Sequence, residues 1–553
     1  MDGGSGFTVG VDVGAGNGNQ PPPLVGYDPL ESDAALLEGV RREGAAWAEE
    51  RIRRAALLAG GEALEWGRLA NAFPPVLRTH DRYGERIEEV EFHPAWHSLM
   101  RAGIELGLHG SPWREAVPGA HVARAAAFMV LAQAESGFGC PISMTYAAVP
   151  ALRAQPDLAA EWEPRLTSLD YDSRAIPVTE KAGALSGMAM TERQGGSDVR
   201  GNTTRAEPAD GAFGITGAKW FCSAPMCDAF LVLAQAPGGL SCFLLPRWRP
   251  DGTRNAFHIQ RLKDKLGNRS NASSEVEFHR AHAWLVGEEG RGVPTIIEMV
   301  NHTRLDCVLG SAGLMRRAVA EATHHAAHRS AFGRLLADQP LMRNVLADLA
   351  VESEAATVTA LRLARAYDEA WGGDPQARTF SRLATAVAKY WVCKRTPPMV
   401  AEALECLGGN GFVEDSGMPL IYRESPLNSI WEGSGNVIAL DVLRAVARTP
   451  ESVEAFFAEV AAAEGAEPRL DAYAAKLRDE LADPTDAEPR ARRLVEQMAL
   501  ALQGSLLVRH GDPTVATAFV ASRLEGDRGL AFGTLPPGVG AKRIVDRATP
   551  RLS

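Results

Sequence analysis

The pattern of apolar residues changes twice along this chain of 553 residues, and these changes restrict its fold more than any single motif. Between about 186 and 288, short apolar runs such as 230–235 and 240–245 alternate with turns that contain Gly and Pro. That alternation predicts a small antiparallel β domain. On both sides of it, apolar residues recur at helical spacing. Long helices are expected at about 293–332, 339–371 and 375–407. The order helical, β, helical predicts an α+β protein with an antiparallel helical bundle.

Composition and turn signals divide the chain into five segments. Residues 1–28 are rich in Gly, Asn and Pro, which predicts a disordered leader. Gly14, Gly16 and Gly18 resemble a nucleotide-binding glycine run, but prolines follow where such a run needs a helix. The other predicted segments are an N-terminal helical domain (29–185), the β domain (186–288), the helical bundle (289–450) and an extra C-terminal helical domain (451–553).

Charge and hydropathy narrow the function classes. The net charge of −11 argues against a protein whose whole surface is built for nucleic acid, although a local basic patch stays open. No apolar run reaches the roughly 18 residues that a membrane span needs, so no membrane association is expected. The first residues lack the basic start and apolar core of a signal peptide. The seven cysteines include no Cys-x-x-Cys pair, which favours a reducing cytoplasm over a disulfide scaffold.

The segment 430–436 combines a carboxylate, an aromatic ring and a Gly-Ser-Gly turn. Glu432 follows Trp431, and Gly433 and Gly435 allow the backbone to turn tightly beside a ligand. Ser434 can cap the apolar helix that follows, and the N-terminus of that helix would point its N–H groups at the turn. Held in this way, Glu432 has the features of a buried general base. A solvated glutamate at a helix N-terminus stays open as the alternative.

Three other segments have the residue types that bind a planar heteroaromatic ligand. The segment 188–199 places hydroxyls beside Gly195-Gly196, where a ligand can approach the backbone closely. The segment 219–223 places an aromatic surface beside Ser223, a mixture of stacking faces and directed donors. The segment 329–333 begins with Arg329, whose guanidinium can hold a pyrophosphate. An ordinary surface arginine stays open as the alternative for Arg329.

Four motifs in the same order resemble the acyl-CoA dehydrogenase family. They are 190–199 (Met-Thr-Glu-Arg-Gln-Gly-Gly-Ser-Asp-Val), 263–269 (Lys-Asp-Lys-Leu-Gly-Asn-Arg), 329–333 (Arg-Ser-Ala-Phe-Gly) and 431–433 (Trp-Glu-Gly). The resemblance covers about 30–450. His93-Pro-Ala-Trp-His97, the longer motif 428–436 and the extra C-terminal segment resemble the AidB-like branch, which is associated with the response to alkylating agents.

The resemblance implies FAD, bound between the β domain, the helical bundle and a neighbouring subunit, and therefore a homo-oligomer, expected to be a tetramer. Thr191 and Ser197 match positions that contact the flavin and the acyl thioester. Phe221 matches the aromatic residue that packs on the flavin, and Ser223 matches a flavin-contacting hydroxyl. Arg329 and Phe332 match residues that reach the FAD of a second subunit. The cofactor-binding residues expected on this basis are Met188, Met190, Thr191, Gly196, Ser197, Phe221, Cys222, Ser223, Arg329, Phe332, Ile430, Trp431, Gly433, Ser434, Gly435 and Asn436.

The same resemblance implies the reaction. Glu432 matches the catalytic base, which removes the α-proton of an acyl thioester such as an acyl-CoA while a hydride passes from the β-carbon to the flavin. Some members place the base just before the position of Arg304, but here that residue is Thr303, which cannot serve. Thr191, Ser197, Ser223 and Arg304 are the expected substrate contacts. An electron-transfer flavoprotein is a candidate electron acceptor.

A metal site is not predicted. His324 and His328 share a helix face, as metal ligands often do, but His325 occupies the place of the glutamate in a His-Glu-x-x-His motif. The two histidines are therefore expected to pack within the protein.

The last part of the C-terminal segment is basic, although the chain as a whole is acidic. Residues 490–553 contain ten Lys or Arg against five Asp or Glu. Because affinity for DNA is largely electrostatic, and because the resemblance implies it, double-stranded DNA is a candidate partner here. Arg490, Arg492, Arg493 and Arg523 are the expected contacts. An ordinary solvated helical surface stays open as the alternative, and so does a DNA-associated protective flavoprotein in which turnover is secondary.

Overall fold

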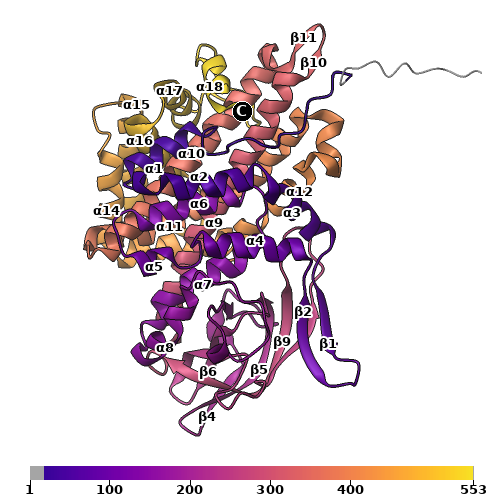
Figure 1. Ribbon diagram of the computed structural model, residues 1–553. Coiled ribbons are helices and arrows are strands. Elements are labelled where there is room, and N and C mark those ends of the chain that lie inside the picture. Colours follow the sequence, from indigo (N-terminus) through magenta and orange to yellow (C-terminus); the bar gives the residue numbers. More distant parts are fainter. Residues whose placement is uncertain (1–17, 552–553) are drawn as a thin grey trace, which may run out of the picture.

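The computed structural model describes residues 18–551, and its elements follow the order helical, β, helical (Figure 1). The N-terminal helices pack together in one layer above the β domain, and the long helices of the bundle lie behind them. Asp33 caps the first helix by accepting a hydrogen bond from the backbone N–H of Leu36. The N-terminal helices are α1 (Ala34–Arg42), α2 (Glu49–Ala59), α3 (Glu62–Ala72), α4 (Pro94–Glu105), α5 (Ser111–Glu115), α6 (Ala120–Leu131), α7 (Gly139–Leu152) and α8 (Pro156–Leu166).

The N-terminal segment also contains a hairpin that was expected to be helical. Its strands are β1 (Val76–His80) and β2 (Arg86–Glu91), which pair in an antiparallel register. The hairpin lies against the β domain, where the guanidinium of Arg254 donates to the carbonyl of Ile87 at 2.6 Å. Its strands carry alternating charged residues and no apolar run, so contacts with the distant β domain, including those of Arg247 and His258 with Glu88, help to stabilise them as strands.

The β domain is a seven-stranded sheet that closes on itself. Its strands are β3 (Ser186–Ala189), β4 (Arg205–Ala209), β5 (Ala212–Ser223), β6 (Ala229–Ala236), β7 (Gly239–Pro246), β8 (Phe257–Leu262) and β9 (Ser273–Val286). The order is β3-β6-β4-β5-β9-β7, with β8 beside β9 and β7 also paired with β6. The pairings β3–β6 and β4–β6 are parallel, so the sheet is mixed and not wholly antiparallel as expected. Phe230 and Phe257 stack inside it with ring centroids 4.9 Å apart.

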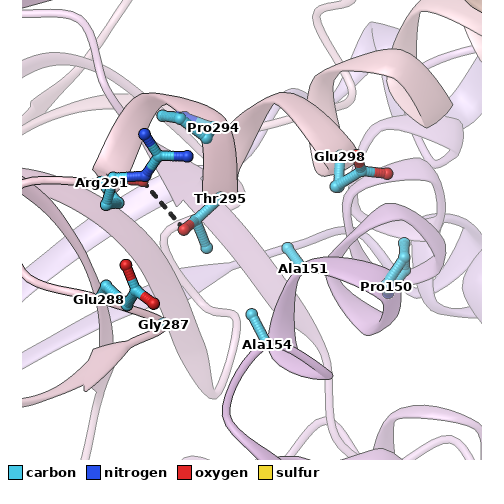
Figure 2. A pocket seen from close by; sticks show the side chains of 9 residues that line it. All are labelled: Pro150, Ala151, Ala154, Gly287, Glu288, Arg291, Pro294, Thr295 and Glu298. Atoms are coloured by element: carbon cyan, nitrogen blue, oxygen red, sulfur yellow. Dashed lines mark hydrogen bonds between the residues drawn. The ribbon is translucent and has the colours of Figure 1, made fainter.

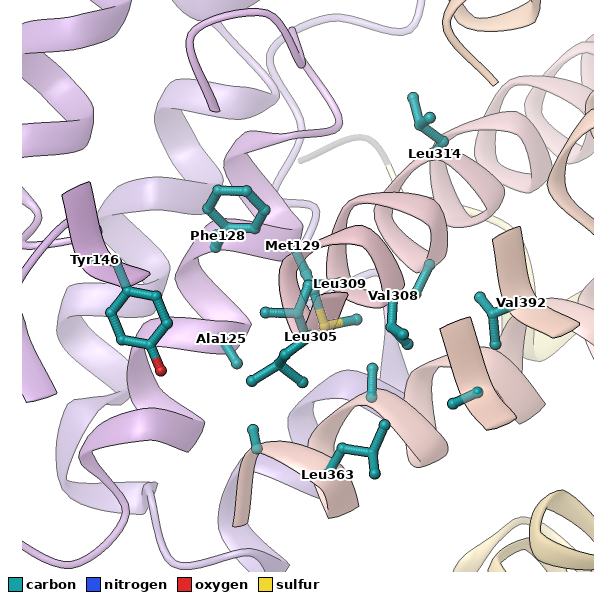
Figure 3. Packing of buried hydrophobic residues seen from close by; sticks show 14 of the residues in the cluster. Ala125, Phe128, Met129, Tyr146, Leu305, Val308, Leu309, Leu314, Leu363 and Val392 are labelled. Carbon is teal, nitrogen blue, oxygen red and sulfur yellow. The ribbon is translucent and has the colours of Figure 1, made fainter. Parts of the chain in front are cut away.

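The helical bundle is built on α9 (Gly292–His328), α10 (Pro340–Trp371) and α11 (Pro375–Cys406). Figure 3 shows its apolar packing, in which Leu305, Val308 and Leu309 of α9 meet Phe128 and Met129 of α6. The two helices approach closely because Gly313 lacks a side chain: a Cβ there would lie 2.5 Å from the carbonyl oxygen of Met129. The predicted helices are confirmed, except that α9 stops at His328 and not near 332.

The chain leaves α9 through a short hairpin, β10 (Ser330–Ala331) and β11 (Arg334–Leu335). Phe332 has φ 51° and Gly333 has φ 80°, left-handed values that produce the tight turn. Figure 1 shows this hairpin at the end of the molecule opposite the β domain. Two shorter helices, α12 (Met418–Glu424) and α13 (Gly435–Arg448), complete the bundle.

The prediction of a disordered leader through residue 28 is wrong for residues 18–28, and residues 1–17 lie outside the described part of the chain. The described segment runs along α9, where Leu24 and Tyr27 are buried with Ala320. The side chain of Asn19 bonds both the N–H and the carbonyl of Ser330, each at 2.8 Å. Composition could not indicate this order, because the partners are about 300 residues away.

The extra C-terminal segment packs on the bundle. Its helices are α14 (Pro450–Ala461), α15 (Pro468–Ala482), α16 (Ala487–His510), α17 (Pro513–Phe519) and α18 (Ala541–Ala548). Helix α15 ends at Ala482, directly before Asp483-Pro-Thr, where proline cannot continue a helix. Helices α16 and α18 contact α10. Across residues 18–551, the helices are all too short or too polar to span a membrane.

Candidate active site

Glu432 lies in the tight loop that joins α12 to α13. Its backbone has φ 57° and that of Gly433 has φ 106°. A left-handed glutamate is strained, and such strain is often found at functional sites. Ser434 occupies the N-cap position of α13, as expected, but its side chain makes no capping hydrogen bond within the described chain. Its hydroxyl is exposed beside the loop, as are Ile430 and Asn436.

Two buried cations bind the carbonyls of three consecutive residues in this loop. Lys389 of α11 donates from Nζ to the carbonyl of Trp431 at 2.8 Å and also to that of Gly433. Arg304 of α9 donates from Nε to the carbonyl of Glu432 at 3.0 Å and from Nη1 to Asp441 at 2.8 Å. Lys389 and Arg304 are 1% and 8% exposed. These bonds fix the backbone from which the Glu432 side chain projects.

The indole of Trp431 is also held. Its Nε1 donates to the Asn428 side-chain oxygen at 2.9 Å, and the Asn428 amide donates to the Ser311 hydroxyl at 3.1 Å. Asn428 and Ser311 are both buried. These bonds fix the loop on the side of Glu432 that faces α12.

The carboxyl group of Glu432 is in a low-dielectric environment. The residue as a whole is partly exposed, but Oε2 is shielded from solvent and has no hydrogen-bond partner among the described residues. Burial raises the pKa of Glu432, and Thr303, Arg304 and Lys389 reduce this rise. A buried carboxylate with an unpaired oxygen and a raised pKa is suited to accept a proton.

A buried ion pair anchors the turn at 190–196. Lys219 of β5 donates to Glu192 at 2.8 Å and to the carbonyl of Leu233 at 2.8 Å. Burial alone would raise the pKa of Glu192, but bonds from Lys219 and Thr203 outweigh it and lower that pKa. The backbone N–H of Trp220 donates to the carbonyl of Thr191 at 2.8 Å. The turn is therefore held rigidly against β5.

The turn itself leaves its polar groups accessible. Met188, Met190 and Thr191 are partly exposed, and Gly196 and Ser197 are exposed. A Cβ at Gly196 would lie 2.3 Å from the hydroxyl oxygen of Thr191, so only glycine keeps this hydroxyl in place. Backbone and hydroxyl groups thus line an open turn that a ligand can approach.

The segment 221–223 alternates between the surface and the core. Phe221 is 51% exposed, so its ring offers an apolar face. Leu266, in the motif 263–269, is 64% exposed and also offers an apolar face. Cys222 is fully buried, and burial raises the pKa of its thiol to about 12. The prediction that Cys222 binds the cofactor is therefore wrong for its side chain, because alternation along β5 points it into the domain. Only its backbone remains for such a contact.

Cys140, at the start of α7, is buried near residues of both the β domain and the Glu432 loop. The polar groups of Ser223 and Asn271 and the charge of Glu432 act on its thiol. Burial raises the pKa of the Cys140 thiol to about 11. Ser223 and Glu432 thus both lie near one buried side chain, although 209 positions in the printed sequence separate them.

Arg329 and Phe332 lie far from the rest of the site. Both belong to the β10–β11 hairpin at the opposite end of the molecule (Figure 1). Phe332 is 98% exposed, and the Arg329 guanidinium bonds the carbonyl of Asn19 at 2.7 Å. Within one chain the hairpin cannot reach residues 190–223.

The structure corrects part of the expected DNA surface. Arg523 is buried and forms ion pairs with Asp348 at 2.5 Å and Glu352 at 3.1 Å, so it cannot contact DNA. Arg490 bonds the carbonyl of Asp483 at 2.6 Å. Arg492 and Arg493 are exposed, although Arg492 also bonds the Tyr390 hydroxyl at 3.1 Å. A basic residue on a helix can face either solvent or the protein core, and the sequence alone does not reveal which of these arginines faces the core.

Other candidate sites have different explanations. The Nε2 of His324 contacts the carbonyl of Pro22 at 2.8 Å, and the Nδ1 of His328 contacts the carbonyl of His324 at 2.8 Å. Among residues 18–551, no His, Cys, Asp or Glu side chains group as metal ligands do.

Figure 2 shows a pocket of about 330 Å³ between the end of α7, the loop 287–291 and the first turns of α9. None of its lining residues belongs to the predicted site.

Sequence reasoning missed the residues that hold the site: Lys389, the Glu192–Lys219 pair, and Cys140. One signal was present. Lys389 is the one charged residue in the run Ala384–Val392, and an isolated charge in an apolar helix must find buried partners.

Known proteins resemble this chain over almost its whole length. Three family models match: the adaptive response protein AidB N-terminal domain at 19–173, the acyl-CoA dehydrogenase middle domain at 187–281 and the acyl-CoA dehydrogenase C-terminal domain at 290–447. A curated relative, the putative acyl-CoA dehydrogenase AidB of Escherichia coli, is 46% identical over 93% of this chain and 95% of its own length.

Two solved structures illustrate the fold. Caenorhabditis elegans ACDH-11, solved in complex with C11-CoA, has a TM-score of 0.85 and 27% identity and covers 92% of this chain and 93% of its own. A Bacillus anthracis acyl-CoA dehydrogenase complexed with FAD shares the fold with a TM-score of 0.61, at 19% identity, over 78% of each chain.

Proposed function

Because the chain belongs to the acyl-CoA dehydrogenase family, we propose that Glu432 is the general base for α,β-dehydrogenation of an acyl thioester. The protein is an FAD-dependent oxidoreductase of the acyl-CoA dehydrogenase type. The observation that carries the proposal is the buried, unpaired Oε2 of Glu432 on a loop whose carbonyls Lys389 and Arg304 bind.

The residues present fit FAD. An exposed aromatic ring at Phe221 offers a stacking face, and the turn at 190–197 offers hydroxyls and backbone without side-chain obstruction at Gly196. In this proposal, Met188, Met190, Thr191, Gly196, Ser197, Phe221 and Ser223 hold the cofactor in one subunit, together with the loop residues Ile430, Trp431, Gly433, Ser434, Gly435 and Asn436. When bound, FAD supplies the hydride acceptor.

The protein's own residues control the proton. Glu432 accepts the α-proton of the thioester at its carboxylate oxygen, and the raised pKa makes it a stronger base. Thr191, Ser197 and Ser223 orient the thioester and the cofactor by hydrogen bonds. Arg304 positions Glu432 through its carbonyl, and its remaining N–H donors can contact the substrate. An acyl-CoA is the substrate class we propose, in keeping with the C11-CoA complex of ACDH-11.

Glu432→Gln tests this proposal. Glutamine keeps the size of the side chain but cannot accept the α-proton at neutral pH. We expect unchanged FAD content and melting temperature, and a loss of acyl-CoA-driven flavin bleaching of at least roughly 10²-fold. Glu414→Gln, which changes an exposed carboxylate of the same domain, is the matched control. Equal bleaching rates in the variant and the parent would show that Glu432 is not the base.

We also propose that the site is completed by a second copy of the chain. Arg329 and Phe332 project from the far end of the molecule, where they can reach the FAD of a neighbour and not that of their own chain. A homotetramer, with an electron-transfer flavoprotein as the electron acceptor, is the assembly we propose from the family resemblance. The seven free cysteines are consistent with a reducing compartment such as the cytoplasm.

A DNA-binding flavoprotein of the alkylation response is the second candidate function. The observation that favours it is the pair of exposed arginines, Arg492 and Arg493, in the first turns of α16. A mobility-shift titration of duplex DNA at two salt concentrations, beside the bleaching assay, separates the two functions. DNA binding that weakens steeply with salt, without bleaching by any acyl-CoA, would favour this second function.

A further inference from the structure

A chain of hydrogen bonds runs from Lys265, a partly buried lysine, to the hydroxyl of Ser223. The Lys265 ammonium donates from Nζ to the carbonyl of Asn271 at 2.6 Å and to the Ser273 hydroxyl at 3.0 Å. The Ser273 hydroxyl lies 3.3 Å from the Ser223 hydroxyl. Lys265 belongs to the loop 263–272, Ser273 begins β9 and Ser223 ends β5, so three segments meet at this chain.

Protonation of Lys265 sets the direction of this chain. An ammonium has three N–H donors and no acceptor, so Ser273 must accept from Lys265 and can donate only onward to Ser223. Ser223 then accepts from Ser273, and its own O–H points away from the lysine. A neutral amine has a lone pair and removes this constraint.

The groups that face Lys265 come from three elements, and all are buried. They are the Cys140 thiol at the start of α7, the Glu424 carboxyl at the end of α12, and the Glu135 carboxyl in the loop between α6 and α7. Burial lowers the pKa of Lys265 to about 8, although these three groups act in the opposite direction. Burial also raises the pKa of Glu424 to about 7. The lysine therefore titrates near physiological pH.

We propose that Lys265 is a positioning residue that, through Ser273, orients the Ser223 hydroxyl toward the flavin and places a switchable positive charge behind it. This inference rests on the proposed function only in placing Ser223 at the FAD. Charge and hydrogen bonds near the reactive ring nitrogens tune a flavin's redox behaviour. A protonated Lys265 should raise the midpoint potential, because it stabilises the additional electrons of the reduced form.

The test is the midpoint potential of the FAD-loaded protein as a function of pH, from about pH 6 to about pH 10, measured by dye equilibration during chemical reduction. In the parent, reduction raises the affinity of Lys265 for its proton. The potential should therefore fall more steeply with pH in a window that begins near the pKa of about 8. In Lys265→Met the steep window should be absent. At pH values below that window, the midpoint potential of the variant should be lower than that of the parent. Arg269→Met, which removes an exposed charge from the same loop, should keep the window.

Ser273→Ala separates the hydrogen-bond chain from the charge. This variant should keep the steep window, because Lys265 is still present, but it should weaken FAD binding by roughly 2- to 10-fold, as expected for one lost hydrogen bond. The losses of affinity in Lys265→Gln and Ser273→Ala should not add in the double variant, because both break the same chain. Lys265→Gln should also lack the window, so it answers the question if Lys265→Met fails to fold.

Failure of this inference is distinguishable from failure of the proposed function, because chemical reduction requires no acyl-CoA. An unchanged potential–pH curve in Lys265→Met and Lys265→Gln would overturn the inference even where acyl-CoA still bleaches the flavin. A lost window in a protein that no acyl-CoA reduces would support the inference and contradict the dehydrogenase proposal. A folded protein that takes up no FAD would overturn both.

Discussion

Lys389 and Arg304, on two different helices, bind the backbone on both sides of one side chain, that of Glu432. Lys389 bonds the carbonyls of residues 431 and 433, and Arg304 bonds the carbonyl between them. Neither cation contacts the carboxyl group through these bonds. They hold the carbonyls of residues 431–433 in place while the backbone of Glu432 and Gly433 adopts left-handed φ values, which Glu432 would otherwise avoid.

Replacing Lys389 should damage both stability and activity. Lys389→Met removes the partner of two partly buried carbonyls, which should lower the free energy of unfolding by about 1–3 kcal/mol in all. A small displacement of Glu432 should slow acyl-CoA-driven flavin reduction by about 10²-fold. Thermal unfolding and stopped-flow bleaching measure the two effects. Arg382→Met is the control, because it changes an exposed cation of the same helix. Normal bleaching in Lys389→Met would show that the loop holds its shape without this cation.

Arg329 should affect a flavin that it cannot reach within its own chain. Arg329→Ala should lower FAD occupancy after gel filtration and shift the apparent mass toward smaller species, because one guanidinium contact to the neighbour's cofactor is lost. Arg334→Ala, in the same hairpin, is the matched control. A monomeric parent that retains FAD stoichiometrically would contradict the shared site.

Glu424 should make stability depend on pH. Burial raises its pKa from 4.5 to about 7, so the folded state binds this proton more tightly than the unfolded state. Its contribution is complete below about pH 4.5 and is lost as the pH rises to about 7, a loss of about 3 kcal/mol. In Glu424→Gln this dependence should disappear, so the melting temperatures of variant and parent should converge or cross as the pH rises from about 5 to about 8. A constant difference across that range would exclude Glu424 as its source.

Arg523 and Arg493 should respond to replacement in opposite ways. Arg523→Met leaves the buried carboxylate of Asp348 without its cation and leaves Glu352 with Arg395 alone, which should cost about 3–5 kcal/mol of stability. Arg493→Ala should leave stability nearly unchanged, because that side chain is 66% exposed.

DNA titrations of the same proteins complete the comparison. If α16 binds duplex DNA, changing Arg492 and Arg493 together to alanine should make DNA affinity less dependent on salt concentration. The slope of log affinity against log salt concentration should fall by the amount expected for about two phosphate contacts. Salt-insensitive binding, or no binding at low salt, would remove the DNA hypothesis.

Local patterns were sufficient to predict much of this protein. The period of the apolar residues located the helical and β segments, because burial of one face depends only on residues a few positions apart. The motif at 430–436 identified Glu432 for a similar reason: a tight turn and a helix N-terminus are local structures. The ends of elements were less predictable, as the early stop of α9 at His328 illustrates.

The sequence by itself determined the order of the domains and indicated Glu432 as the candidate base. Only the tertiary structure decided that Lys389 and Arg304 hold Glu432, that Arg523 lies in the core, and that residues 18–28 are ordered against α9. The physical reason is common to all three. A buried charge or an ordered segment is stable only beside partners that compensate its desolvation or its lost entropy, and those partners come from distant parts of the chain.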